Sequence, residues 1–509
     1  MSFNKKEYDF VIIGSGLGGL ACAYILASEG YSVVVLEKNH QIGGNLQVFS
    51  RDKCIFDTGV HYIGSLDKGE NLHQFFKYFG LIGKLKLKKL DEDGFDVIRF
   101  NDGKTFKHAQ GYDNFKKTLL KDFPDEAAAI NDYCNKLKET CLDFHLYNLK
   151  TITTSTHLDN LDLLSINAHD YIASITSNKL LQNVLAGTNG LYAGIKERTP
   201  WYVHALVINS YLTGAYRLED GGSQIAIHLS KSIREMKGEI YKRKEVVGAN
   251  YNELGKISEV ILSTGETVKG KHFISNAHPS TTIDIFGEDK FLKAYTKRIQ
   301  NLENSSSSFI VHFVFKKNSF PYLNYNIYQF KTDDVWDSIN YTQENWPKAY
   351  FACTPASSRS KKFAESMSIM VYMNSKETEK WANTKNTIAT KNNRGEDYEA
   401  FKKEKEQKII DILEEDFPGI KSKIKSVYSS TPLTFRDYIG DKTGAMYGII
   451  RDNNNPIKTS INSKTKIKNL SLTGQNIVLH GVLGVTIGAF VTCFEFLDKH
   501  QLINKVKNS

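Results

Sequence analysis

The sequence predicts a two-domain α/β protein in which one domain is built on a parallel sheet. Three observations lead to this fold class. The first is a strand–turn–helix–strand pattern over Tyr8–Glu37, and the second is a strand that ends in a glycine turn, Leu470–Gly474. The third is the length of 509 residues, which is too great for one compact core and indicates two or three domains.

The N-terminal segment carries a dinucleotide-binding pattern. The apolar run Tyr8–Ile13 is followed by Gly14, Gly16 and Gly19, by an apolar helix face and by a second apolar run, Val33–Leu36. The first glycine allows a tight turn, the second lets the backbone approach a pyrophosphate, and the third lets helix and strand pack closely. Glycines at this spacing alone are a weak signal. Strand, glycines, helix and strand in register predict dinucleotide binding.

An acidic residue completes this pattern. Glu37 ends the second apolar run, where a carboxylate can accept hydrogen bonds from both ribose hydroxyls. A carboxylate there also repels a 2′-phosphate, so NADP is disfavoured. The start of the helix adds free N–H groups that favour phosphate binding.

Composition narrows the class of protein. Hydrophobic residues make up 41% and charged residues 24%, as in ordinary globular proteins. The six cysteines form no C-x-x-C pair, which argues against a disulfide framework or a zinc site and favours a reducing, cytoplasmic compartment. The net charge of +9 fits a solvated lysine-rich surface, or attraction to an anionic membrane. No motif indicates nucleic-acid or metal binding, and the polar N-terminus shows no secretory signal.

One apolar stretch, Ile477–Cys493, could be mistaken for a membrane span. It is shorter than the roughly 20 residues that a spanning helix needs, and glycines interrupt it. We therefore predict a buried strand, loop and helix. Elsewhere the patterns predict helices within 112–148 and 398–417 and a hairpin around Thr264-Gly265.

Several sequence motifs resemble those of one family of proteins. They are Gln41-Ile42-Gly43-Gly44-Asn45, Phe56-Asp57-Thr58-Gly59-Val60-His61-Tyr62, Phe273-Ile274-Ser275-Asn276-Ala277-His278-Pro279, and Thr431–Tyr438. Together with the first pattern they resemble flavoproteins of the phytoene desaturase type. The sequence around Asp57–Tyr62 is most similar to that of the branch of retinol saturases and plant-type carotenoid isomerases. The resemblance implies FAD in a glutathione-reductase-like Rossmann domain, a discontinuous α+β substrate domain, and a hydrophobic polyene isoprenoid as substrate.

The resemblance also implies which residues contact the cofactor. These are Gly14, Ser15, Gly16, Gly18, Gly19, Glu37, Lys38, Gly43, Gly44, Asn45, Gly59, Val60, Val246, Val247, Asn276, Gly474, Gln475, Gly484, Val485 and Thr486. Gln475 departs from the wider family, which usually has an aspartate there. A glutamine can donate and accept hydrogen bonds but brings no charge.

The resemblance also implies how the chain divides into domains. Residues 1–108, 205–285 and 430–509 are expected to form the FAD-binding domain, and residues 109–204 and 286–429 the substrate and lid domain. Aromatic residues are frequent in the second set, which suits an apolar pocket, although aromatics also build ordinary cores.

Candidates for catalysis are His61, Tyr62, His480 and Arg436, with His204 as a further buried polar candidate. A purely structural role is the alternative for each of them. His61 and Tyr62 come from one end of the chain and His480 from the other, and we expect all three to line one cavity beside the flavin. His61 or Tyr62 is the expected proton handler, since an imidazole titrates near neutral pH.

The predicted function is that of an FAD-dependent oxidoreductase acting on CH–CH bonds of a polyene, with hydride exchange at flavin N5. A second G-x-G-x-x-G is absent from the sequence, so no built-in nicotinamide site is expected. One alternative is a flavin amine oxidase, which would need a polar cage for the amine. The other is a flavin-bound lipid-binding protein without turnover. We also expect peripheral contact with the cytoplasmic membrane, because a polyene dissolves in lipid. The substrate, reaction direction, electron partner and oligomeric state stay open.

Overall fold

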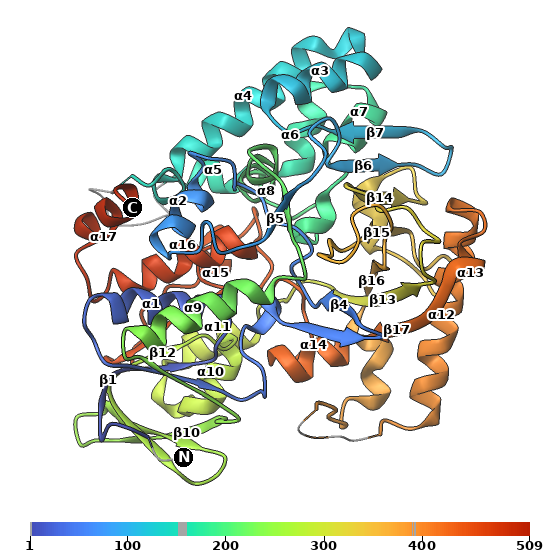
Figure 1. Cartoon of the computed structure of the whole chain (residues 1–509). Coiled ribbons are helices and arrows are strands. Elements are labelled where there is room, and N and C mark those ends of the chain that lie inside the picture. Colours follow the sequence, from blue (N-terminus) through green and yellow to red (C-terminus); the bar gives the residue numbers. More distant parts are fainter. Residues whose placement is uncertain (1–2, 151–159, 389, 391–392) are drawn as a thin grey trace.

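Two sheets organise the chain in the computed structural model, which describes residues 3–150, 160–388, 390 and 393–509 (Figure 1). The first sheet has the order β10-β11-β12-β1-β2-β9, and β18 also pairs with β12. Its strands are β1 (Tyr8–Ile13), β2 (Val33–Glu37), β9 (Glu239–Lys242), β10 (Val246–Tyr251), β11 (Ile257–Leu262), β12 (Thr267–Ser275) and β18 (Leu470–Leu472).

The centre of the first sheet is parallel and buried. β1 lies between β2 and β12, and all three run parallel, as do β9 and β18 at their sides. Every residue of β2 is buried, which explains its unbroken apolar run. β10 and β11 add an antiparallel extension, with the expected hairpin turn at Gly265, whose φ is +84°.

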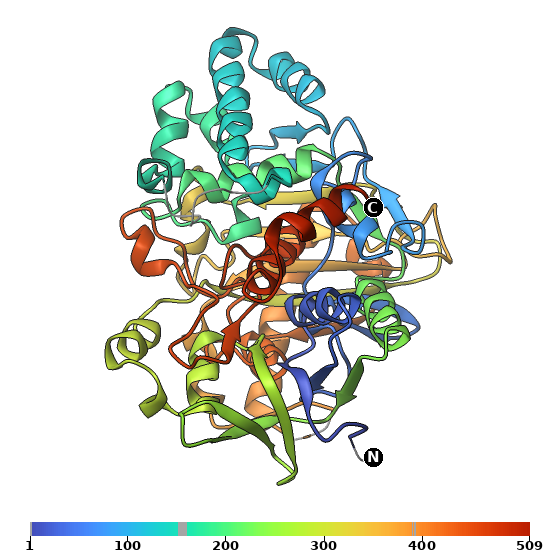
Figure 2. The same cartoon turned by 90° about the vertical axis from the view of Figure 1, so that its left-hand side faces the viewer.

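Helices cover both faces of this sheet. On one face α1 (Leu17–Ser28) packs between α16 (Gly481–Cys493) and α9 (Ser223–Glu235), and Figure 2 shows α1 and α16 close together. On the other face lie α10 (Pro279–Phe286) and α11 (Lys293–Gln300), which bury Ile283, Phe286 and Ile299 against Val11 and Val34. This doubly wound arrangement confirms the predicted fold class.

The second sheet has the order β17-β13-β16-β15-β14-β6-β7. Its strands are β6 (Asp96–Arg99), β7 (Thr105–His108), β13 (Ser307–Phe315), β14 (Asn326–Phe330), β15 (Ala349–Cys353), β16 (Ser366–Met373) and β17 (Ile424–Ser430). β13 is buried along its whole length, and α12 (Glu396–Asp416) packs Ile409 and Leu413 on this sheet. Most pairs are antiparallel, but β14 and β6 run parallel.

A group of helices lies at the far end of the second sheet, at the top of Figure 1. It consists of α3 (Tyr112–Asp122), α4 (Ala127–Asp143), α5 (Leu161–Ser165), α6 (Ala168–Ile175), α7 (Lys179–Leu185) and α8 (Trp201–Leu212), with α4 packed along α8. The remaining elements are β3 (Val48–Arg51), β4 (Cys54–Asp57), β5 (Leu87–Lys89), β8 (Tyr216–Leu218), α2 (Asn71–Tyr78), α13 (Ile420–Lys423), α14 (Pro432–Ile439), α15 (Pro456–Thr459) and α17 (Lys499–Lys507), together with short 3-10 turns.

The expected division of the chain into two domains stays a prediction, and the packing departs from it at α11, which covers the first sheet although it was expected in the second domain, and at two strands. β6 and β7, which cover 96–108, pair within the second sheet, whereas the expected boundary placed them with the first. Their register with β14 explains the difference, because Val97 and Ile98 pair with Ile327 and Tyr328. The helices predicted within 112–148 and 398–417 appear as α3, α4 and α12. No helix among the described residues has the length and apolar character needed to cross a membrane, and 477–493 ends in the 13-residue helix α16.

Candidate active site

A narrow cradle lies where β1 and β18 end. Gly14 has a φ of +92°, which turns the chain out of β1, and its N–H donates to the carbonyl of Leu36 at 2.8 Å. A Cβ on Gly19 would lie 2.1 Å from the carbonyl oxygen of Gly14, so only glycine permits this packing of α1 on β1. The third glycine therefore has the close-packing role that the sequence indicated.

Three further glycines let backbone segments approach one another closely beside this turn. A Cβ on Gly18 would lie 2.9 Å from Cα of Gly474, and a Cβ on Gly44 would lie 3.1 Å from Cα of Gly16. A Cβ on Gly16 would reach only the side chain of Asn276, at 2.7 Å from Nδ2. Backbone from three distant segments thus converges at the N-terminus of α1, where Asn276 supplies the nearest side chain, and we call this place the glycine channel. Such a channel suits the pyrophosphate of a dinucleotide.

Glu37 is held in a fixed position at the end of β2. One carboxylate oxygen accepts hydrogen bonds from the backbone N–H of Ser15 at 2.9 Å and from its hydroxyl at 2.5 Å, and the other accepts from the N–H of Asn39 at 2.8 Å. The Glu37 side chain is buried, and its remaining lone pairs are free to accept from ribose hydroxyls. Ser15 also joins the Gly43 backbone, because its hydroxyl accepts from that N–H at 3.2 Å.

The residues present fit the FAD that the resemblance implies. In addition to the glycine channel and Glu37, two buried polar atoms near the expected flavin path have no hydrogen-bond partner within the described part of the chain: Asn45 Oδ1 and His61 Nε2. Buried polar atoms are normally satisfied, so these two mark a place for a polar ligand.

The other expected cofactor residues are distributed around the same path. Lys38 is half-buried and donates to the carbonyl of Asp437 at 3.2 Å, and desolvation of its ammonium group lowers its pKa. Val246 is buried but Val247 is 50% exposed. Gly474 has a φ of +98°, and Gln475 follows it in the turn that leads to α16. Gly59, Val60 and Gly484 line the cavity described below, whereas Val485 and Thr486 lie deeper in α16, where the Thr486 hydroxyl donates to the carbonyl of Val482.

A large cavity opens between the two sheets and α8. Its walls come from the segment 59–64, from the loop before α16, from β14, β15 and β16, and from α8. The aromatic side chains on these walls are Phe144, Tyr147, Tyr211, Phe330, Tyr350, Phe351, Tyr372 and Tyr447, together with Tyr62 and Tyr328. Among the described lining residues there is no Asp, Glu, Lys or Arg.

The structure brings His61, Tyr62 and His480 to this one cavity. The His61 ring lies 5.7 Å from the Phe351 ring, and the His480 ring lies 4.5 Å from the Tyr447 ring. His480 Nε2 is 3.0 Å from the carbonyl oxygen of Leu191. Their roles in catalysis stay predictions.

The expected titration of His61 near neutral pH is wrong. Burial lowers its pKa to about 4, and the positive charge of Arg217 lowers it further. Burial likewise lowers the pKa of His480 to about 4. Both imidazoles are therefore neutral at neutral pH, and each can donate one hydrogen bond and accept another, but neither is a reservoir of an acidic proton.

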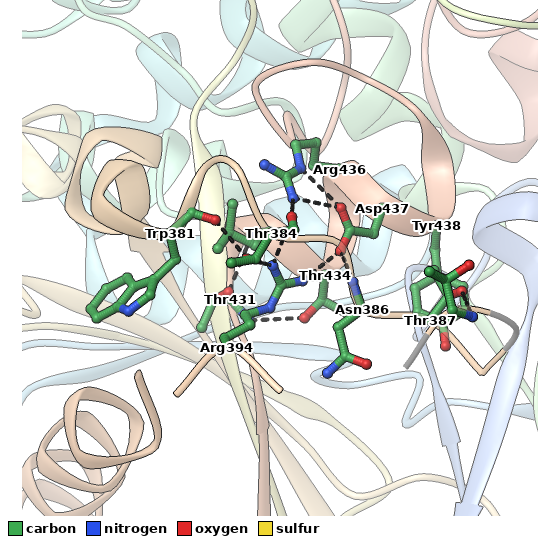
Figure 3. A network of polar contacts seen from close by, with 12 residues as sticks. Trp381, Thr384, Asn386, Thr387, Arg394, Thr431, Thr434, Arg436, Asp437 and Tyr438 are labelled. Atoms are coloured by element: carbon green, nitrogen blue, oxygen red, sulfur yellow. Dashed lines mark hydrogen bonds and ion pairs between the residues drawn. The ribbon is translucent and has the colours of Figure 1, made fainter. Parts of the chain in front are cut away.

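Arg436 lies in a different place. It belongs to α14, is absent from the cavity wall described above, and pairs with the adjacent Asp437 at 2.7 Å. Figure 3 shows Arg436 and Arg394 both pointing at Asp437, and Arg394 forms a buried ion pair with it at 2.5 Å. Arg436 also donates to the carbonyls of Ala382 and Thr384. This arrangement ties the segment after Trp381 to α14 and accounts for Arg436 by structure alone.

His204 is also explained by structure. It lies in α8 and is fully buried, with its Nε2 2.7 Å from the Tyr133 hydroxyl and its Nδ1 2.8 Å from the Tyr192 hydroxyl. Burial lowers its pKa to about 3. It does not belong to the cavity wall.

Sequence reasoning missed a polar group behind the cavity. Asp96, Asn326, Tyr328 and Arg217 come from β6, β14 and β8, and all are buried. Asp96 Oδ2 accepts from Tyr62 at 2.9 Å, and Arg217 donates to the Asn326 side chain at 2.7 Å. These residues have no common sequence motif. An aspartate at the start of an apolar strand was the only signal that pointed to one of them.

The comparisons with known proteins agree with this geometry. A family model for an NAD(P)-binding Rossmann-like domain matches residues 12–79. An all-trans-retinol 13,14-reductase from Danio rerio is 27% identical over 96% of this chain and 85% of its own. A chloroplastic prolycopene isomerase from Daucus carota is 25% identical over 87% of this chain and 72% of its own. The chain is a homologue of these two kinds of enzyme.

Solved structures support the fold alone. A putrescine oxidase variant has a TM-score of 0.64 and 13% identity, with 99% of both chains covered. The homologues confirm the branch of proteins that the sequence resembles, and the likeness to putrescine oxidase extends over both domains.

Proposed function

We propose that this protein is an FAD-dependent oxidoreductase that acts on carbon–carbon bonds of a polyene isoprenoid. The single observation that supports this most strongly is the cavity between the sheets. It is aromatic and free of charged residues within the described wall, and the segment 59–64 that follows the glycine cradle is part of that wall. Such a wall suits a neutral, conjugated hydrocarbon, whose burial is favourable in proportion to its apolar area. The retinol reductase and prolycopene isomerase relatives give the same substrate class by name.

FAD bound in the cradle would supply hydride exchange with the polyene. The chain contributes binding and orientation: the glycine channel receives the pyrophosphate, Glu37 receives the ribose, and Asn45 and His61 offer their unpartnered atoms near the flavin. The aromatic walls exclude water, which protects a reactive intermediate on the substrate. Tyr62 holds a proton at its hydroxyl on the cavity wall.

The amine oxidase alternative fits the cavity less well. An ammonium substrate requires a counter-charge, and the described cavity wall provides no carboxylate for it. The likeness to putrescine oxidase is a likeness of fold at 13% identity. The substrate and the electron partner determine whether the reaction is saturation, desaturation or isomerisation.

We also propose peripheral contact with a membrane. Leu142 of α4, Leu161 of α5 and Ile457 of α15 are 57%, 45% and 61% exposed. α5 packs against both α8 and α15, and α8 carries part of the cavity wall. Exposed apolar side chains on helices near α8 suit uptake of a polyene from lipid. Replacing all three residues with serine should reduce sedimentation with anionic liposomes, and unchanged sedimentation contradicts this contact.

Pigment analysis tests the proposed activity. A polyene-producing cell that expresses the wild-type chain should change its pigment profile, either in the number of double bonds or in their geometry. The Gly16→Ala variant, which places a methyl group in the cradle and weakens FAD binding, should change the profile less than the wild-type chain does. Identical profiles for wild type and vector control contradict the proposed function.

A further inference from the structure

We propose that Tyr328, Tyr62 and Asp96 form a proton-transfer chain that leads from the cavity to a buried carboxyl and serves the reaction on the substrate. This inference rests on the proposed function. It adds a proton donor for the carbon that does not receive hydride. Tyr328 and Tyr62 are on the cavity wall, and Asp96 acts through them as a positioning residue and proton store.

The three side chains are joined end to end. The Tyr328 and Tyr62 hydroxyl oxygens are 2.7 Å apart, and the Tyr62 oxygen is 2.9 Å from Asp96 Oδ2. Both distances are in the range of O–H···O hydrogen bonds. The exposed fractions are 4% for Tyr328, 6% for Tyr62 and 1% for Asp96, so bulk water does not compete for these bonds.

The protonation state of Asp96 sets the direction of the hydrogen bonds among the three side chains. With Asp96 neutral, its O–H donates to Tyr62 and Tyr62 donates to Tyr328. The Tyr328 hydrogen then has no acceptor among the described residues, and it is free to point into the cavity. With Asp96 ionised, both hydroxyls turn toward the carboxylate. The two states differ by the transfer of one proton across three oxygens, which is the property that a relay requires.

The surroundings keep Asp96 near the balance of these states. Burial raises its pKa to about 7, and the hydrogen bonds from Asn326 and Tyr62, and the charge of Arg217, act in the opposite direction. Asn326 Nδ2 donates to Asp96 Oδ1 at 2.8 Å and stays in place in both states. Arg217 lies behind Asn326 and makes no direct ion pair with Asp96 among the described contacts.

The other titratable groups nearby do not replace Asp96. His108 on the paired strand β7 is neutral, because burial lowers its pKa to about 4, and it faces the carbonyl of Val184. On α8, burial raises the pKa of Tyr211 well above its usual value. Burial lowers the pKa of His61 to about 4. Asp96 is therefore the described carboxyl that is hydrogen-bonded to the Tyr62–Tyr328 pair, and its pKa of about 7 lets it exchange a proton near neutral pH.

Saturation of a C=C bond adds a hydride to one carbon, with a reduced flavin as the reductant, and a proton to the other carbon. The Tyr328 O–H bond breaks as the new C–H bond forms. Tyr328 takes the proton of Tyr62, Tyr62 takes that of Asp96, and Asp96 becomes a carboxylate hydrogen-bonded by Asn326 and Tyr62. In desaturation the same protons move in the opposite sense.

A merely structural role is the competing explanation, because buried polar groups also satisfy one another. A spectroscopic measurement on the resting FAD-loaded protein separates the two. Below neutral pH, infrared difference spectra should show a neutral carboxyl C=O band that Asp96→Asn removes and that Tyr62→Phe shifts. Asp57→Asn assigns the band of another buried carboxyl, whose pKa burial also raises to about 7. If the wild-type protein lacks an Asp96 band, the relay is overturned.

Kinetic measurements provide a second test of the proton-transfer chain. Asp96→Asn and Tyr328→Phe should keep FAD and polyene binding, lower turnover by about 10²–10⁴-fold, and remove a pH transition near neutrality. Tyr133→Phe is the matched control, since it deletes a buried, hydrogen-bonded hydroxyl away from the cavity wall, and it should leave turnover unchanged. Wild-type turnover and pH profile in Asp96→Asn overturn the relay. If wild-type protein converts no polyene, the proposed function fails, and the infrared arm still decides whether the relay exists.

Discussion

Alanine at position 16 would place one methyl group in the glycine cradle and leave the rest of the fold nearly undisturbed. Gly16 has a φ of −62° and a ψ of 171°, which any residue can adopt. Its Cβ would approach only Asn276 Nδ2 within 3.0 Å, and the next atom is 3.9 Å away. Asn276 can move its side chain, so we expect the unfolding free energy of the apoprotein to change by less than about 1 kcal/mol.

Cofactor affinity should respond much more strongly. Overpacking in a tight site costs about 1–3 kcal/mol, which corresponds to a loss of affinity of about 5- to 150-fold. FAD titration of the apoprotein, followed by flavin fluorescence, measures this loss, and thermal unfolding checks the fold. Gly248→Ala is the matched control, because its Cβ would have only ordinary contacts, the nearest at 3.6 Å. A Gly16→Ala protein with wild-type FAD affinity refutes the placement of the pyrophosphate.

Three further predictions concern buried charges and the cavity. The pKa of Asp96 rises from 3.8 to about 7 on folding, so the folded state holds more protons between these values and stability falls as pH rises through this window. Asp96→Asn should flatten that dependence, by at most about 1.4 kcal/mol per pH unit, in denaturant titrations. Arg394→Met leaves Asp437 with Arg436 as its one cationic partner among the described residues and should lower the unfolding free energy by about 3 kcal/mol, as measured by thermal unfolding. Arg359→Met removes a half-exposed ion pair with Glu365 and should lower it by under about 1 kcal/mol. Equal losses in the two variants would contradict this. His61→Ala should keep FAD and lose most turnover, because the unpartnered Nε2 of His61 is placed beside the flavin site. The wild-type rate should show no transition from His61 between pH 5 and 8, because burial lowers its pKa to about 4. A fully active variant would contradict a role of His61 in turnover.

Local patterns predicted the first sheet well. β1, α1 and β2 follow from contiguous residues, since the strand runs, the glycines and the acid all lie within Tyr8–Glu37. Gly16, Gly44 and Gly474 also lie close together in the structure, although they are far apart in the sequence, and their contact with a cofactor stays a prediction. The homologues confirm the resemblance on which the later motifs depended.

Tertiary contacts account for what the sequence could not give. β6 joins the second sheet because it pairs with β14, a strand more than two hundred residues away in the chain. His61 is neutral because burial, which a single sequence does not reveal, lowers its pKa. Arg436 is engaged by Asp437 and by carbonyls of the segment after Trp381, and nothing in its own motif indicated those partners.

The most direct test of the proposed function uses the purified, FAD-loaded protein and a dispersed polyene under anaerobic conditions, with the flavin either oxidised or chemically reduced. The visible flavin spectrum is followed while chromatography separates the polyene products. The proposed function predicts a polyene product that differs by two hydrogens or in double-bond geometry, and a flavin spectrum that changes when the product is a redox product. An unchanged polyene with both flavin states, in a protein that retains its FAD, would contradict it.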